Sequence, residues 1–194
     1  MMTLRTRPTM ARPILALIAA MAFAPVLTQA QDKFGARNGT ITFFSSAPLE
    51  DITAVNHNAA GVLVPATGAL EFSVLIKAFE FQKAKMQEHF NENYMESGKW
   101  PKAQFKGMLK PKPGEDLTTI GKHVVEVAGT LTIHGVEKPL SSTATLTVAP
   151  DGSIAANCVF NVRPEDHAID IPAVVRDNIA KSVRVTVDIT YRKL

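Results

Sequence analysis

The sequence predicts an all-β fold, an eight-stranded antiparallel barrel with one or two short helices. The first observation is alternation. In SVRVTVDITY, residues 182–191, every second residue is apolar and the residues between are polar or charged, which is the period of a strand with one wet face. The second is length, because several such stretches have about ten residues or more and span over about 30 Å. Closing into a barrel removes the exposed edges of long one-sided strands. A sandwich is the alternative that periodicity does not exclude.

Alternation recurs along the chain, and turn-forming residues separate the alternating segments. In chain order the predicted strands are Thr40–Ser45, Ile52–Val64, Ala69–Lys77, Lys102–Leu109, His123–His134, Leu140–Val148, Ser153–Val162 and 182–191. The turn signals between them are Ala66-Thr67-Gly68, Lys112-Pro113-Gly114, His134-Gly135 and Pro150-Asp151-Gly152. Several neighbouring strands are therefore predicted to pair as antiparallel hairpins.

Two segments break the alternation and predict short helices. From Gln82 to Phe90 the strand period fails, and Met86 and Phe90 lie four residues apart on one side. A weaker candidate runs from Pro172 to Ala180, with proline in a first-turn position. Neither segment is long enough to be a stable helix alone, so we expect each to dock on the sheet.

The first thirty residues are typical of a secretory signal peptide. Arg5, Arg7 and Arg12 precede an apolar run from Ile14 to Ala24, and small residues follow at Thr28 and Ala30. The run is too short for a permanent membrane-spanning helix, which takes about 20 apolar residues. We therefore expect a signal peptide over residues 1–30, one domain over residues 31–194 with no integral membrane segment, and a periplasmic or secreted location.

Charge and cysteine content argue against a nucleic-acid-binding protein and against a fold held together by disulfides. Three of the 21 basic residues and none of the 18 acidic residues lie in residues 1–30, so the remainder carries as many basic as acidic side chains. No dense run of lysine or arginine is present, and we expect no nucleic-acid partner. Cys158 is the only cysteine, so no internal disulfide is possible.

No motif points to catalysis or to a metal. The histidines lack metal-ligand spacing and are scattered over His57, His89, His123, His134 and His167. We expect His134 to be a turn residue whose ring bonds a backbone group, and Cys158 to be an inert thiol on an apolar strand face. An enzyme acting inside the barrel would need a buried acid or base, and the assignable inward positions are almost all apolar. We therefore expect a protein that is not an enzyme and uses no cofactor.

Two long segments resemble a known family. FSVLIKAFEFQKAKMQEHFNENYMESGKWPKAQFKG (72–107) and GTLTIHGVEKPL (129–140) are similar to the YceI-like family of bacterial secreted proteins, also called lipid/polyisoprenoid-binding domains. The most specific pieces are HFNENYMES, WPKAQF and LTIHG. The resemblance covers nearly all of residues 31–194. It implies a lipocalin-like barrel that encloses a long apolar chain, such as an isoprenoid quinone or a fatty-acid derivative.

The segment between the predicted helix and the strand at Lys102 is unusually apolar for a linker, with Tyr94, Met95 and Trp100. We expect Met86, Phe90, Tyr94 and Met95 to form a lid over one end of the barrel, and Trp100 to anchor the chain where it returns to the strand. The alternative is that these side chains plug a solid core. The predicted ligand-binding residues are Phe43, Phe72, Val74, Ile76, Met86, Phe90, Tyr94, Met95, Phe105, Val125, Val127, Leu131, Ile133 and Phe160.

Two function classes follow from these observations. The first is a periplasmic carrier or reservoir for an apolar lipid chain. The second is a filled barrel whose outer surface interacts with a partner or acts in a stress response, without a lipid ligand. The sequence leaves both open.

Overall fold

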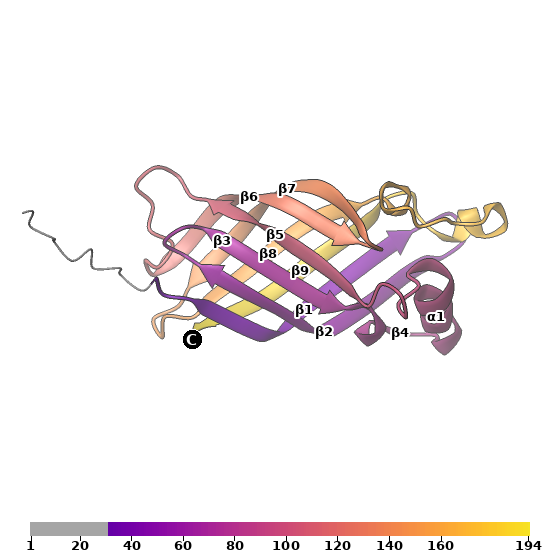
Figure 1. The fold of residues 1–194 in the computed structure, drawn as a ribbon, viewed down its shortest axis with the longest axis horizontal. Coiled ribbons are helices and arrows are strands. Elements are labelled where there is room, and N and C mark those ends of the chain that lie inside the picture. The colour runs from indigo at the N-terminus through magenta and orange to yellow at the C-terminus, as the bar shows by residue number, and fades with distance from the viewer. Residues whose placement is uncertain (1–30) are drawn as a thin grey trace, which may run out of the picture. The chain divides into compact units, whose positions relative to one another are not determined.

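The alternating segments form strands in the computed structural model, which describes residues 31–194 (Figure 1). The signal peptide predicted for residues 1–30 lies outside these residues. The strands are β1 (Phe34–Ser46), β2 (Asp51–Val64), β3 (Ala69–Leu75), β4 (Glu80–Phe81), β5 (Lys102–Lys110), β6 (Gly121–Ile133), β7 (Val136–Val148), β8 (Ile154–Val162) and β9 (Val183–Lys193).

The strands form one antiparallel sheet that closes on itself. Its order is β1-β9-β8-β7-β6-β5-β3-β2, with the two-residue β4 beside β2. Because β1 also pairs with β2, the other eight strands make a closed barrel. The predicted eight-stranded antiparallel barrel is thereby confirmed, and closure excludes the sandwich.

Short helices gather at one end of the barrel, the end at which α1 lies in Figure 1. The helix predicted over residues 82–90 is present with tighter bounds, and the weaker candidate over residues 172–180 is a 3-10 helix. The helical segments are η1 (Ile76–Ala78), α1 (Ala84–His89), the π-helical η2 (Phe90–Tyr94), η3 (Pro164–His167) and η4 (Ala173–Asn178). With six residues and no side-chain cap at its N-terminus, α1 depends on docking for its stability.

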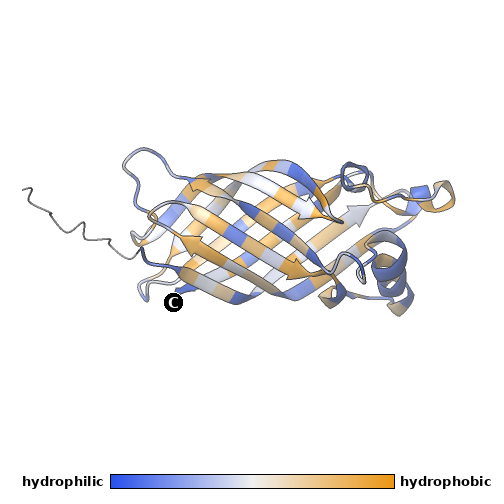
Figure 2. Cartoon of the chain, in the orientation of Figure 1, coloured by the Kyte–Doolittle hydropathy of each residue, from blue (hydrophilic) through white to orange (hydrophobic). Residues whose placement is uncertain are grey.

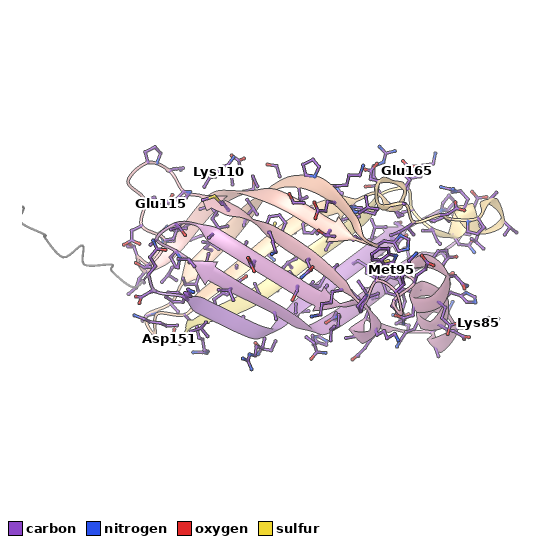
Figure 3. All side chains as sticks on the ribbon, in the orientation of Figure 1. Lys85, Met95, Lys110, Glu115, Asp151 and Glu165 are labelled. Carbon is purple, nitrogen blue, oxygen red and sulfur yellow. The ribbon has the colours of Figure 1, made fainter. Side chains whose placement is uncertain are left out.

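We call the helical end the mouth and the opposite end the base. Figure 3 shows Lys85 and Met95 at the mouth, and Glu115 and Asp151 at the base. The chain thus presents two different ends to solvent, and each has its own closing elements.

Two strands differ from their predicted bounds for local reasons. β1 begins at Phe34, well before the predicted Thr40, because a register shift around Gly39 lets the glycine-containing stretch keep pairing with β2. A side chain at Gly39 would meet Ile189 at 2.9 Å. β3 ends at Leu75 because the next residue, Ile76, begins η1, and the Ile76 N–H donates to the Pro101 carbonyl at 2.9 Å.

Two strand ladders stop short of the mouth, and side chains bridge the gaps. The β2–β3 ladder ends at Ala60 and Ser73. Beyond it, the fully buried Asn56 of β2 donates from Nδ2 to the Leu75 carbonyl at 2.9 Å. The β7–β8 ladder likewise ends at Ala144 and Cys158. Past that point, the Ser142 hydroxyl donates to the Val159 carbonyl at 2.9 Å. The barrel therefore widens towards the mouth without leaving these groups unbonded.

The base of the barrel is filled by a continuous apolar cluster. Leu117, from the loop between β5 and β6, is 2% exposed and packs among inward residues of the strand ends, including Phe34, Val125, Val148 and Ile154. Each buried leucine or isoleucine of this kind contributes roughly 1.5–3 kcal/mol. The loop thus closes the base as a plug.

His123 fixes the plugging loop. Its Nδ1 lies 2.8 Å from the Glu115 carboxylate, and its Nε2 lies 2.8 Å from the Thr119 carbonyl. Both partners only accept hydrogen bonds, so the protonated ring satisfies both contacts. The Thr119 carbonyl and then the Glu115 carboxylate raise the pKa of His123, and the hydrogen bond from His123 lowers the pKa of Glu115.

We expect the wild-type protein to lose stability relative to His123→Gln as the pH rises above about 6.5. The folded state holds the His123 proton more tightly than the unfolded chain does. Its contribution is therefore complete below that pH and is lost as the pH passes the raised pKa of the folded state. Denaturant midpoints of both proteins between about pH 5.5 and 9 measure the difference.

His167 also changes protonation state with pH, but its effect cancels in that comparison. Burial lowers its pKa, so its own stabilising effect is present at high pH and is lost as the pH falls. Because both proteins contain His167, its effect cancels in the difference. A midpoint difference that stays constant across the pH range would contradict the role given to His123.

Candidate binding cavity

The inward side chains of the barrel do not fill its centre but line a cavity of about 370 Å³. All eight barrel strands contribute to the wall, and nearly all the contributing side chains are apolar. In Figure 2, hydrophobic and hydrophilic positions alternate along the front strands of the barrel, which is the pattern that turns one set of side chains inward. The size falls within the range of small-molecule sites.

Thirteen of the fourteen residues predicted to bind ligand line this cavity. That they contact a ligand stays a prediction. They are Phe43, Phe72, Val74, Ile76, Met86, Phe90, Tyr94, Met95, Phe105, Val127, Leu131, Ile133 and Phe160. The exception is Val125, which is 2% exposed and packs in the filled base below the cavity. Alternation gives the face of a residue but not its height in the barrel.

The α1–η2 segment covers the mouth and is held by Phe90. Its ring centroid lies 5.5 Å from that of Phe43, 5.7 Å from that of Phe79 and 5.0 Å from that of Phe81. Such aromatic pairs contribute about 0.5–1.5 kcal/mol beyond their buried area. Met95 makes a second attachment, because it is buried against Ile76 and Ile169. We call residues 84–95 the lid.

Trp100 anchors the chain between the lid and β5, as predicted. Its ring lies against the β6–β7 turn, with a centroid separation of 6.0 Å from His134. A side chain at Gly135 would meet the indole at 2.4 Å, and Gly135 also has a φ of 74°. Only glycine therefore fits the turn against which Trp100 packs.

A hydrogen-bonded chain joins the end of the lid segment to two other loops at the mouth. The ring of His134 lies 2.8 Å from the Glu96 carboxylate and 3.2 Å from the His167 carbonyl. The His167 ring in turn lies 3.1 Å from the Val136 carbonyl. The expectation that His134 is a turn residue bonded to backbone is confirmed, and its turn has a left-handed φ of 52°.

Sequence reasoning missed a second group of cavity residues at the mouth. Phe79 and Phe81 flank the start of β4, and four residues of the loop between β8 and β9 also line the cavity: Ile169, Ile171, Val175 and Ile179. The signal was present as apolar residues two or four apart, but these segments lie in loops and short helices, where alternation has no fixed meaning.

Polar groups in the cavity wall are few. Glu50, His89 and Asn178 lie towards the mouth, and Glu50 is paired with Lys83 at 2.6 Å. Cys158 faces the cavity, and burial raises its pKa, so it is held as a thiol rather than a reactive thiolate. Within residues 31–194, no cluster of three His, Cys, Asp or Glu side chains could hold a metal ion. The helices of that same range are all too short or too polar to span a membrane.

A closed eight-stranded barrel has an interior that side chains can just fill or that can hold one small ligand. The family model described as the YceI-like domain matches residues 21–191. The chain therefore belongs to the YceI-like family. No curated protein matches the chain.

Solved structures with the same fold have low sequence identity to the chain. A polyisoprenoid binding domain from Saccharophagus degradans aligns with a TM-score of 0.72 at 13% identity, covering 86% of this chain and all of that one. BcnA from Burkholderia cenocepacia aligns with a TM-score of 0.66 at 12% identity, covering 78% of this chain and 95% of that one. A YceI protein from Campylobacter jejuni gives 0.55 at 16% identity, covering 73% and 84%.

We expect Met86→Ala combined with Phe90→Ala to open the lid locally. Because α1 is short and uncapped, removing one docking side chain from α1 and one from η2 should raise amide exchange in residues 84–95 by at least about tenfold. Exchange in β6 and β7 should change much less. Hydrogen exchange followed by mass spectrometry measures both regions in one experiment.

The matched control is Lys85→Ala, which changes an exposed residue of the same helix. It should leave lid exchange near the wild-type rate. If the double variant instead raises exchange equally throughout the barrel, residues 84–95 are part of the global core and are not a lid.

Proposed function

We propose that this protein is a periplasmic or secreted binding protein that holds a long apolar chain inside its barrel. The ligand is an isoprenoid quinone, a polyisoprenoid or a fatty-acid derivative, and the protein carries or stores it without chemical change. The observation that carries the proposal is the apolar cavity in the barrel, with walls from all eight strands.

The cost of an empty cavity supports this proposal over a filled barrel. The side chains that line the 370 Å³ cavity have no protein atoms to pack against on that side. A bound chain would offset this cost, because each buried CH₂ contributes about 0.8 kcal/mol.

The character of the wall supports binding rather than catalysis. Its middle section has no carboxylate, lysine or histidine side chain, and its thiol is held protonated. An apolar chain needs only shape and dispersion contacts from such a wall. The family and the S. degradans polyisoprenoid binding domain point in the same direction. The signal-peptide pattern of residues 1–30 is the basis for a location outside the cytoplasm.

We expect solvent extraction of the purified protein to release a stoichiometric lipid that mass spectrometry identifies. After removal of that lipid, saturated chains of increasing length should bind about fourfold more tightly for each added CH₂ until the cavity is full. Because no charge lines the middle of the wall, affinity should change little with salt. Displacement of a fluorescent apolar probe measures both trends.

Two adjacent alanines of β8 provide a matched pair of variants. Ala156 lines the cavity, whereas Ala155 is exposed. Ala156→Leu should lower affinity for the longest chains by at least about tenfold, since it occupies space for two or three CH₂ groups. Ala155→Leu should bind like the wild type. Strong salt dependence with no chain-length trend would instead favour the alternative, a barrel whose outer surface binds a partner.

A further inference from the structure

The deepest polar group of the cavity is the hydroxyl of Tyr191. Its residue belongs to β9, is 2% exposed and lines the cavity next to Leu63, Leu109 and Leu146, where the cavity meets the filled base. The ring reaches past β1, and its hydroxyl ends beside Gly61 of β2. A side chain at Gly61 would meet that oxygen at 2.8 Å. Glycine at this position therefore leaves room for the hydroxyl.

The Tyr191 hydroxyl has no hydrogen-bond partner within residues 31–194. Burial is the sole cause of the raised pKa of Tyr191, with no hydrogen bond contributing. Two other hydroxyls of the wall are already bonded: the Ser142 hydroxyl donates to the Val159 carbonyl, and the Ser45 hydroxyl accepts from the Ala180 N–H. Within residues 31–194, the fully enclosed side-chain polar atom without a partner is Asn91 Oδ1. The Tyr191 hydroxyl keeps some accessible surface, and because Tyr191 lines the cavity, a bound molecule can supply the partner that the protein does not.

The surroundings of Tyr191 define the partner that would satisfy it. A phenol donates one hydrogen bond and can also accept one, and the donated bond requires an acceptor oxygen on the partner. The residues around it are apolar, and the charged wall residues Glu50 and His89 lie towards the mouth. A carboxylate or phosphate at this depth would be buried without a counter-ion, which is strongly unfavourable. The acceptor is therefore neutral.

We propose that Tyr191 is a specificity-determining residue that donates a hydrogen bond to a neutral carbonyl oxygen at the leading end of the bound chain. The ligand class is then a long apolar chain ending in a ketone, ester, amide or quinone. It enters with its polar end first, and its apolar tail lies under the lid. This inference rests on the proposed function and adds the chemistry and the orientation of the ligand.

The test compares a long-chain methyl ketone with the alkane of the same carbon number on the lipid-free protein, by displacement of a fluorescent apolar probe. Wild type should bind the ketone more tightly than the alkane. Tyr191→Phe should reduce this preference by about 3- to 10-fold, the worth of one hydrogen bond, and leave alkane affinity equal or higher. An undiminished preference in Tyr191→Phe would overturn the proposal.

The chain contains only two tyrosines, and the other, Tyr94, lies in the lid. Loss of the ketone preference in Tyr94→Phe but not in Tyr191→Phe would place the polar end at the mouth and overturn the proposal. In Tyr94→Phe, Tyr191 is the sole tyrosine, so ultraviolet resonance Raman spectra report its hydroxyl alone. At a ketone concentration that saturates Tyr94→Phe in the displacement assay, those spectra should change from a free to a donating hydroxyl, and an unchanged spectrum at saturation would count against the proposal.

The stability of the ligand-free protein tests independently whether the Tyr191 hydroxyl has a partner inside the protein. Tyr191→Phe removes a hydroxyl without a partner, so its denaturant midpoint should equal or exceed that of the wild type. A clear fall would reveal an internal partner for the hydroxyl and overturn the proposal. If wild type binds neither compound, the proposed function itself fails, whereas tight binding of both compounds without the ketone preference removes only this inference.

Discussion

Pairing of β1 with β2 is the constraint on which the rest of the structure depends. It turns a sheet of long one-sided strands into a barrel, so that the apolar faces point inward and no long edge is left unpaired. Eight strands set an interior that side chains can just fill or that can hold one small ligand. In this barrel, side chains fill the interior near the base, and the interior towards the mouth is hollow. The same fold therefore has both a core and a cavity.

The two ends of the barrel are closed by different physical means. At the base, Leu117 is part of the continuous core, and the bonded His123 ring fixes its loop. At the mouth, a six-residue helix depends on a cluster of four phenylalanine rings centred on Phe90. The strand ladders that stop short of the mouth make that end wider. The continuous core thus lies at the base, and the short segments that would have to move for a ligand to enter lie at the mouth.

The sequence pattern predicts whether a strand residue faces inward or outward, but not where it lies along the barrel axis. Alternation placed Val127 and Leu131 inside correctly, yet it could not tell that Val125 lies in the filled base. It also missed the first half of β1, because the glycines after Phe34 look like a loop and the bulge at Gly39 becomes visible only through pairing. The role of Tyr191 depends on which groups its hydroxyl fails to meet, and no local pattern contains that information.

The central claim is that an apolar chain binds inside the barrel, and intermolecular nuclear Overhauser effects test it most directly. An unlabelled saturated chain is added to isotope-labelled, lipid-free protein. Contacts should appear to inward residues such as Val74, Leu131 and Phe160, and not to Leu49 or Val174, which are 74% and 91% exposed. A chain that binds but contacts only such exposed side chains would contradict the claim.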